Sequence, residues 1–164
     1  MPRGGRPVRR GLLLAGLGAA LGGGPAGSAE SVAAYTVAED EIPRPLTAAA
    51  GDPARGEDIV RDRELGNCLI CHALPIADEP FQGTVGPDLA GLAGRLTAGQ
   101  MRLRVVDATL VNADSAMPAY HRIDGLERVA DEYRGKAVLS AAQVEDVVAY
   151  LLTLRAPRAG EDRQ

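Results

Sequence analysis

The sequence contains two cysteines separated by two residues and followed at once by a histidine: Cys68, Cys71 and His72. This C-x-x-C-H spacing is the signature of covalent c-type haem attachment. Both thiols bond one edge of the porphyrin through thioethers, and the backbone then delivers the adjacent imidazole beneath the iron as the proximal ligand. The sequence therefore predicts one haem c, held covalently by Cys68 and Cys71, with His72 as an axial ligand of the iron.

Three other interpretations of the same residues are weaker. A disulfide between Cys68 and Cys71 would leave His72 unexplained. A zinc site could add His121, the only other histidine, but structural zinc sites usually show a second close pair of ligands, and this sequence has none. A thioredoxin-like redox pair would be followed by a long helix, whereas Pro75 comes four residues after the second cysteine. Haem attachment remains the favoured prediction.

The second axial ligand has three candidate assignments. A methionine thioether suits low-spin haem and raises its reduction potential. Met117 precedes Pro118 in an irregular stretch between two expected helices, so it is well placed to cross the distal face of the haem. Met101 lies inside an amphipathic pattern, where methionine more often fills the core. His121 would give bis-histidine haem with a lower potential, and an open site would indicate ligand binding. We favour Met117.

Residues 1–29 have the features of a cleaved export signal. Four arginines precede an apolar run from Leu12 to Leu21, which is too short to span a bilayer comfortably. Small residues, Gly27-Ser28-Ala29, then stand where signal peptidase would cleave before Glu30. An uncleaved membrane anchor is the lesser option. The sequence predicts a periplasmic protein without a membrane span in its mature form, which fits c-type haem attachment outside the bacterial inner membrane.

The net charge of the mature chain limits the classes of molecule that it could bind. The sequence has 18 basic and 22 acidic residues, and removal of the four leader arginines leaves 14 against 22, a formal charge of −8. Such an acidic surface argues against nucleic acid or an anionic membrane as the partner. The mature chain is long enough for one domain and too short for two.

Three helices are expected, and no segment has a convincing β-strand pattern. The first starts with Asp52 as N-cap and Pro53 at the first helical position, and runs up to or into the haem motif. The second has Thr97 as its N-cap and ends near Asn112. The last begins at a capping box of Ser140 and Gln143. Apolar residues then recur on one face at helical spacing: Val144, Val147, Val148, Leu151 and Leu152.

These elements predict an all-α domain over residues 51–155, wrapped around the haem, with a polar tail over residues 156–164. Gly56 in the first helix would allow a close helix crossing against Tyr150. The proline-rich and glycine-rich loop between residues 75 and 94 would run around the porphyrin edge, with a short helical turn at residues 88–92. Residues 30–50 form an extended N-terminal arm, either a mobile linker or a segment that wraps a partner subunit.

The order of these motifs resembles that of a class I cytochrome c over residues 51–155. The matching pieces are the C-x-x-C-H motif, Gly86-Pro87-Asp88-Leu89, Met117-Pro118 and the closing helix with Val148-Ala149-Tyr150-Leu151. The resemblance implies a class I cytochrome c fold. It also implies that the carbonyl of Pro87 accepts a hydrogen bond from the proximal imidazole, which is the orienting contact that a metal-bound histidine needs.

Longer strings are similar to SoxX, the mono-haem subunit of the sulfur-oxidation cytochrome SoxAX. They are residues 66–75, 81–91, 102–107 and 117–120. The resemblance implies a heterodimer with a SoxA-like cytochrome, in which thiosulfate is joined to a cysteine of the carrier SoxYZ. This chain would accept the released electrons and pass them to a downstream cytochrome c, with no catalytic residues of its own. A stand-alone electron shuttle and a haem subunit of another dehydrogenase or oxidase are the alternatives.

Overall fold

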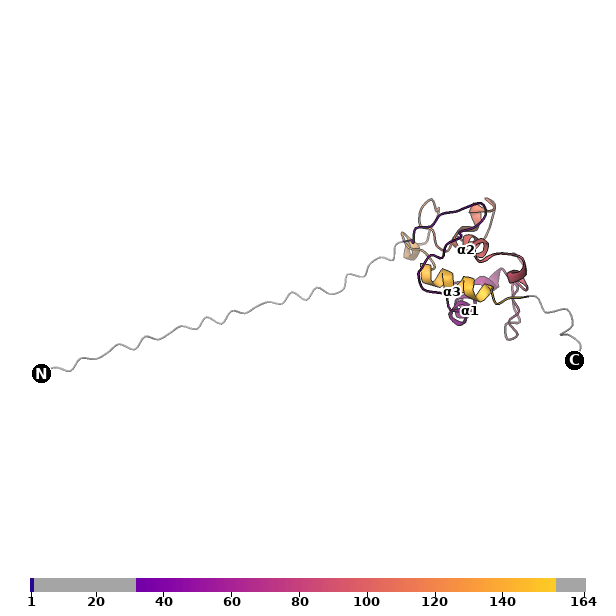
Figure 1. Cartoon of the computed structure of the whole chain (residues 1–164), viewed down its shortest axis with the longest axis horizontal. Helices are drawn as coiled ribbons and strands as arrows, with labels where there is room; N and C mark the ends of the chain where they lie inside the picture. The colour runs from indigo at the N-terminus through magenta and orange to yellow at the C-terminus, as the bar shows by residue number, and fades with distance from the viewer. Residues whose placement is uncertain (2–31, 156–164) are drawn as a thin grey trace, which may run out of the picture.

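The computed structural model describes Met1 and residues 32–155, and within them it contains helices and loops but no β-strand (Figure 1). The α-helices are α1 (Pro53–Arg61), α2 (Ala98–Asp107) and α3 (Ala141–Leu151). Short 3-10 turns lie between them: η1 (Cys68–Ile70), η2 (Leu92–Gly94), η3 (Ala108–Leu110) and η4 (Asp131–Tyr133). The all-α class predicted from the sequence is confirmed. The expected signal peptide and polar tail lie outside the described residues.

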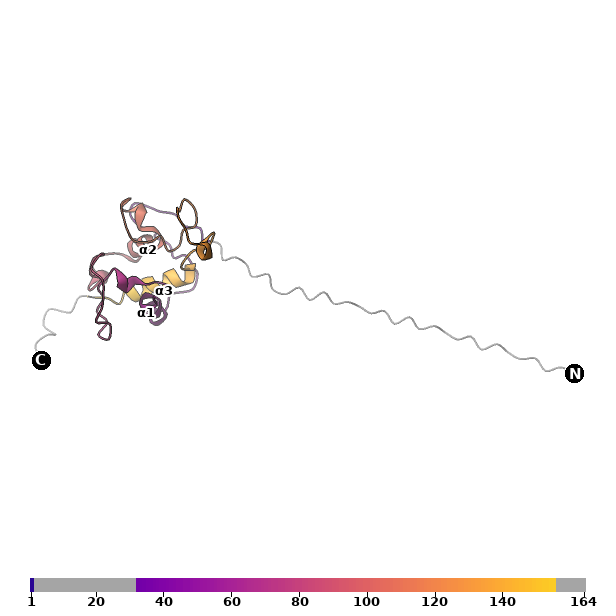
Figure 2. The same cartoon turned by 180° about the vertical axis from the view of Figure 1, so that it is seen from behind.

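Helix α3 is the centre of the fold. It packs against both α1 and α2, and Figures 1 and 2 show it between them from opposite sides. Its apolar stripe is almost wholly buried, as expected for the core-facing side of an amphipathic helix. Leu152, the last member of the predicted stripe, is the exception, because it stands after the final helical residue and is partly exposed.

The predicted helix starts are confirmed. The Asp52 side chain accepts hydrogen bonds from the first turn of α1, and Pro53 occupies the first helical position. Thr97 caps α2, and Gln100 completes a capping box with it. Ser140 and Gln143 form the expected capping box at α3. Each cap satisfies backbone N–H groups that a helix end leaves without a partner.

Three of the predicted boundaries were wrong. Helix α1 stops at Arg61, well before the haem motif, because Asp62 is extended. The chain then turns back, and the Asn67 N–H donates to the Asp62 carbonyl. Helix α2 stops at Asp107, whose carboxylate accepts from the backbone and hydroxyl of Thr109 and so favours a tighter 3-10 turn. The helical turn expected at residues 88–92 lies slightly later, as η2.

The expected close crossing of α1 and α3 at Gly56 is present. A Cβ atom built on Gly56 would overlap the carbonyl oxygen of Asp146 and lie 2.8 Å from Cβ of Tyr150. Only a residue without a side chain lets the two backbones approach this closely.

We therefore expect Gly56→Ala to lower the free energy of unfolding by about 3 kcal/mol, since the helices must separate to admit the methyl group. Urea denaturation followed by circular dichroism measures the loss. Gly94→Ala is the control, because a Cβ at Gly94 meets nothing within 4 Å. An equal, small effect of both substitutions would contradict the tight crossing.

Asp146 ties the start of α1 to α3. Its carboxylate accepts from the Asp52 backbone N–H at 2.7 Å and from Arg55 Nε and Nη2 at 2.8 and 2.9 Å. The hydrogen bond from Arg55 is the main reason that the pKa of Asp146 lies below its ordinary value near 3.8. A carboxyl group whose pKa is lower in the folded state contributes stability above its unfolded pKa, and this is lost as the pH falls through the folded pKa.

We expect Asp146→Asn to destabilise the protein by about 1–3 kcal/mol at pH 7, because charge-assisted hydrogen bonds are lost. The difference from wild type should shrink as the pH drops below the ordinary carboxyl value near 3.8. Thermal unfolding between pH 7 and pH 2 measures it. A difference that stays constant over the acid range would show that Asp146 acts only through packing.

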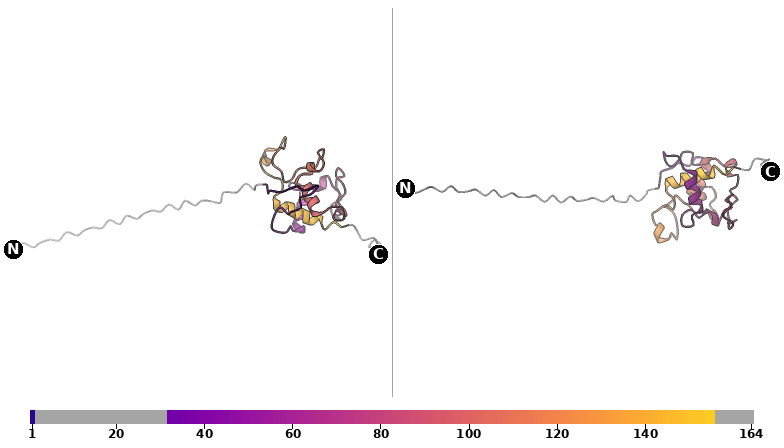
Figure 3. Two further views of the ribbon diagram at one scale, coloured as in Figure 1. Left: turned by 45° about the horizontal axis from the view of Figure 1, so that its top comes forward. Right: turned by 90° about the horizontal axis from the view of Figure 1, so that it is seen from below.

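Residues 32–50 lie against the helical body, as Figure 3 shows for the indigo segment. Ile42 is 1% exposed, and its N–H donates to the Gly99 carbonyl at 3.1 Å. Its own carbonyl accepts from Arg102 Nη1 at 2.7 Å. The Leu46 N–H donates to Glu145 Oε1 at 2.8 Å. This arm contains no helix, but its backbone turns at Glu39 and Asp40 and bends over residues 46–49, and a mobile linker does not describe it.

A buried ion pair fixes the arm, α2 and α3 to one another. Arg102 Nε and Nη2 lie 2.7 and 2.9 Å from the two carboxylate oxygens of Glu145, and both side chains are almost fully buried. The remaining contacts of each partner go to the arm, at Ile42 and Leu46. None of the helices in the described part of the chain has the length and apolar character needed to cross a membrane.

Candidate haem site

The C-x-x-C-H motif folds as the tight turn η1. Asn67 adopts a left-handed conformation (φ 49°) immediately before it, and the N–H groups of Cys71 and His72 both donate to the Cys68 carbonyl, at 3.2 and 3.0 Å. Both cysteines are free thiols and half-buried. The turn therefore presents two thiols and an imidazole from one short stretch of backbone, and no disulfide joins the cysteines.

The His72 ring is oriented by the loop that follows the motif. Its Nδ1 lies 2.7 Å from the carbonyl oxygen of Pro87, and because a carbonyl can only accept, Nδ1 is the protonated nitrogen. This leaves the lone pair on Nε2 for a metal ion, which is the tautomer that iron ligation needs.

Gly86 lies directly against the same ring. A Cβ atom at this position would overlap Cε1 of His72 and lie 2.6 Å from Nδ1, so no other residue fits without moving the imidazole. The residues present thus fit a haem: an imidazole held in orientation, with two free thiols on the adjacent turn.

A series of backbone hydrogen bonds holds the loop to the motif. Gly83 N–H donates to Leu69, Gly86 N–H to Cys71 and Leu89 N–H to Ala73, at 2.8, 2.8 and 2.9 Å. The acceptors are every second residue of the motif segment and the donors every third residue of the loop, so the loop lies alongside the motif. This register brings the Pro87 carbonyl to His72.

The Cys68 thiol lies in largely desolvated surroundings. Burial raises the pKa of the Cys68 thiol to about 11, and the nearby Cys71 contributes in the same direction. Because a thiolate is the reactive form, this thiol is not an activated nucleophile at neutral pH. The environment suits a sulfur atom engaged in a neutral thioether.

Tyr120 supports the turn from the other side. Its hydroxyl donates to the Gly66 carbonyl at 2.7 Å, and its ring is buried. Its own N–H donates to the Val105 carbonyl of α2 at 3.3 Å. Sequence reasoning missed the structural roles of Tyr120 and Gly86. The only available signals were a tyrosine in a chain with few aromatic residues and a glycine directly before Pro87.

His121 is 1% exposed, and both of its ring nitrogens are bonded to backbone groups. Nδ1 lies 2.7 Å from the Leu139 carbonyl, and Nε2 accepts from the Ala33 N–H at 3.0 Å. Nδ1 is thus the protonated nitrogen, and the Nε2 lone pair is already used. Among the described residues, no group of three or more histidine, cysteine, aspartate or glutamate side chains could hold a metal ion. This arrangement weakens both the bis-histidine and the zinc interpretations.

Met117 lies on the loop between η3 and Tyr120, half-buried against the hydrophobic core. The Val111 N–H donates to the Ala108 carbonyl at one end of this loop, and the Tyr120 N–H donates to Val105 at the other. The loop is therefore fixed to the end of α2 on both sides. Among the candidates for the second axial position, Met117 has a thioether whose sulfur is not required for any hydrogen bond of the fold.

One solved structure similar to the chain is the crystal structure of SoxXA from P. pantotrophus. The two sequences are 37% identical, the match covers 74% of this chain and 94% of that chain, and the TM-score is 0.68. No protein-family model and no curated protein matches the sequence. The structural match supports the class I cytochrome c fold and extends over nearly the whole of the related chain.

Proposed function

The chain belongs to the SoxX family of cytochromes, and from this premise we propose that it is the electron-accepting, mono-haem subunit of a SoxAX-type L-cysteine S-thiosulfotransferase. In the proposed reaction, the carrier SoxYZ contributes a cysteine thiol and thiosulfate contributes its terminal sulfur. A sulfur–sulfur bond forms, the thiol proton is released, and two electrons leave.

The residues of the candidate haem site have separate roles. Cys68 and Cys71 would hold the cofactor covalently, and His72, oriented by Pro87, and Met117 would supply nitrogen and sulfur ligands to its iron. Bound haem would supply a one-electron redox centre. The observation that carries the proposal is the His72 imidazole, held at Nδ1 by the Pro87 carbonyl with Nε2 left for iron.

No thiol remains on this chain for the sulfur chemistry, because its only two cysteines belong to the haem motif. The new sulfur–sulfur bond is therefore formed on the partner, a SoxA-like cytochrome, and this chain contributes no catalytic residue. We place the mature protein in the periplasm after signal cleavage, with a diffusible cytochrome c as the downstream acceptor.

Reduction of the chain's haem by thiosulfate tests the proposal. The mature holo-protein is mixed with a purified SoxA-like subunit and SoxYZ, and absorbance follows reduction. We expect reduction only when both partners and thiosulfate are present. Dithionite, which needs no partner, is the control for a competent haem. Reduction by dithionite but not by the complete mixture would make the chain a stand-alone shuttle or a subunit of another enzyme.

A further inference from the structure

Tyr120 joins the start of the haem motif to the segment that carries Met117. Its hydroxyl donates to the Gly66 carbonyl at 2.7 Å, across 54 residues of sequence, and its side chain is buried. Gly66 stands two residues before Cys68, and Tyr120 stands three residues after Met117. One buried phenol ring therefore spans the space between the two segments that supply the proposed haem ligands.

The backbone at Tyr120 is held from two sides. The Tyr120 N–H donates to the Val105 carbonyl at 3.3 Å, and the His121 N–H donates to the Val106 carbonyl at 3.2 Å, both in α2. The Tyr120 carbonyl accepts from the Leu139 N–H at 2.8 Å, just before α3. A tyrosine side chain has only two rotatable dihedral angles up to its ring. The packed helices therefore determine where the hydroxyl lies.

The acceptor of this hydrogen bond is also held in place. Gly66 is buried, and a Cβ atom built on it would overlap the Ile59 carbonyl of α1. Asn67 follows with a left-handed backbone and leads into η1. Within the described part of the chain, Tyr120 is the one donor to the Gly66 carbonyl. A buried carbonyl without a donor is costly, so the hydroxyl is the natural partner of this backbone group.

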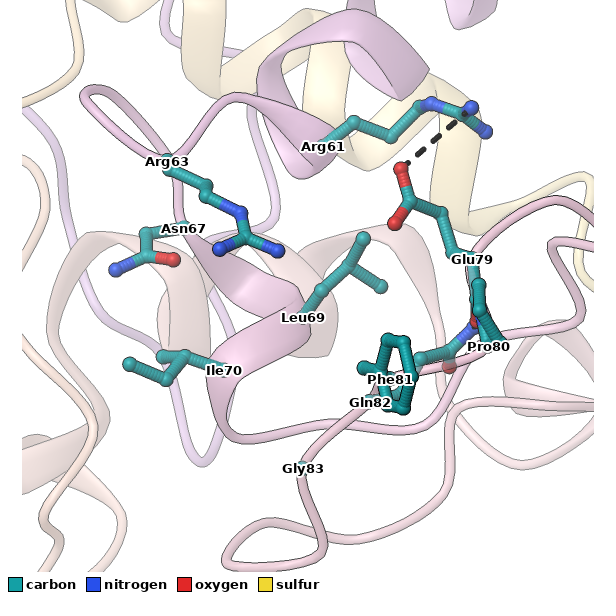
Figure 4. Close-up of a pocket in the computed structure, with 10 residues that line it drawn as sticks. All are labelled: Arg61, Arg63, Asn67, Leu69, Ile70, Glu79, Pro80, Phe81, Gln82 and Gly83. Atoms are coloured by element: carbon teal, nitrogen blue, oxygen red, sulfur yellow. Dashed lines mark hydrogen bonds and ion pairs between the residues drawn. The ribbon is translucent and has the colours of Figure 1, made fainter.

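The turn itself is open on one side. A surface hollow of about 550 Å³ lies against it, and Figure 4 shows Asn67, Leu69 and Ile70 along this hollow. Tyr120 does not line the hollow but lies near the Cys68 thiol. Burial has the largest effect on the pKa of that thiol and raises it, and a contact with the Tyr120 hydroxyl acts in the opposite direction. Tyr120 thus supports the turn from the side of its first thiol.

We propose that Tyr120 is a positioning residue that sets the separation between the haem motif and the Met117 segment, and thereby the strength with which Met117 binds the iron. The inference rests on the proposed function, because it takes Met117 as an iron ligand. The Met117 N–H donates to Ser115 Oγ at 3.2 Å, and Pro118 restricts the backbone that leads to Tyr120. A ligand on a loop binds more tightly when the loop is already ordered in the bound conformation. Loss of the hydroxyl would loosen this arrangement without removing any ligand.

The test is displacement of the methionine by added imidazole in the ferric holo-protein, followed by absorbance. Imidazole nitrogen is a good ligand for haem iron, so its apparent affinity rises when Met117 binds less firmly. Tyr120→Phe keeps the ring and removes the hydroxyl, which leaves the Gly66 carbonyl without its donor. We expect this variant to bind imidazole about 5-fold to 10-fold more tightly than the wild type. Tyr120→Leu, which also removes the ring, should have a larger effect.

Two control variants separate positioning of the ligand from general stability. Gly56→Ala disturbs the crossing of α1 and α3, and Tyr150→Phe removes the hydroxyl of another buried tyrosine at the same crossing. Each should change the apparent affinity for imidazole less than about 2-fold, because distant and independent sites contribute separately. Gly56→Ala nevertheless lowers the free energy of unfolding, so a merely structural effect would be visible in this control.

Three results would overturn the inference. Equal imidazole affinity of the wild type and Tyr120→Phe removes the positioning role and leaves the proposed function intact. An equal gain in Gly56→Ala and Tyr120→Phe reduces Tyr120 to one of many residues that stabilise the fold. A wild-type absorption spectrum without methionine ligation removes the inference together with the assignment of Met117 in the proposed function.

Discussion

Met117→Ala is expected to lower the reduction potential of the haem by on the order of 0.2 V and to change its absorption spectrum from low spin towards high spin. A thioether ligand stabilises reduced iron, and alanine offers no donor atom in its place. Potentiometric titration followed by absorbance measures both changes. The effect should be large because axial ligands set haem potentials over a range of about 0.8 V.

The matched control is His121→Gln. Both His121 ring nitrogens are bonded to backbone groups, so its replacement should lower stability and leave the potential near that of the wild type. If the potential and spectrum instead follow His121 and are insensitive to Met117, the axial pair is bis-histidine. If neither substitution alters them, the distal position is open.

Arg102→Met should cost about 3–5 kcal/mol of unfolding free energy, because it leaves the Glu145 carboxylate buried without its partner. The Ile42 carbonyl would lose its donor as well. Urea denaturation of the holo-protein measures the change. The exposed pair of Arg134 and Asp131 provides the control, with side chains 69% and 90% exposed. Arg134→Met should cost less than about 1 kcal/mol.

A second variant separates the charge effect from packing. Arg102→Met combined with Glu145→Leu removes the orphaned carboxylate, and we expect it to recover part of the stability lost in Arg102→Met. Recovery should be incomplete, because the Leu46 N–H then loses its acceptor. The contrary result would be that Glu145→Leu lowers the free energy of unfolding of Arg102→Met as much as it lowers that of the wild type. The two side chains would then be energetically independent, and the ion pair would not hold the arm.

Local chemistry explains which parts of the fold could be predicted. Helix starts depend on one capping side chain and the next few residues, so Asp52, Thr97 and Ser140 were recognisable from the sequence. The end of α1 depends on a turn that places Asn67 in a left-handed conformation. No glycine or proline directly after Arg61 marks this helix end in the sequence. The end of α2 depends on Asp107 bonding Thr109, a competition that a hydrophobic pattern does not reveal.

The same distinction applies to the site. The cysteines and His72 are contiguous, so their motif is visible in the sequence, whereas the contact of His72 with Pro87 required the resemblance to class I cytochromes. The role of His121 could not be predicted, because its two partners, Ala33 and Leu139, lie far from it in sequence. The arm was ambiguous for the same reason: its partners are on α2 and α3.

The long-range contacts of the arm and of the α1 N-cap have a consequence for the order of folding. Ala33 pairs with His121, Leu46 with Glu145 and Asp52 with Asp146, across 88, 99 and 94 residues. Closing such large loops is entropically costly and slow. If the chain emerges N-terminus first, residues 33–52 therefore cannot form all of these contacts until α3 has emerged as well.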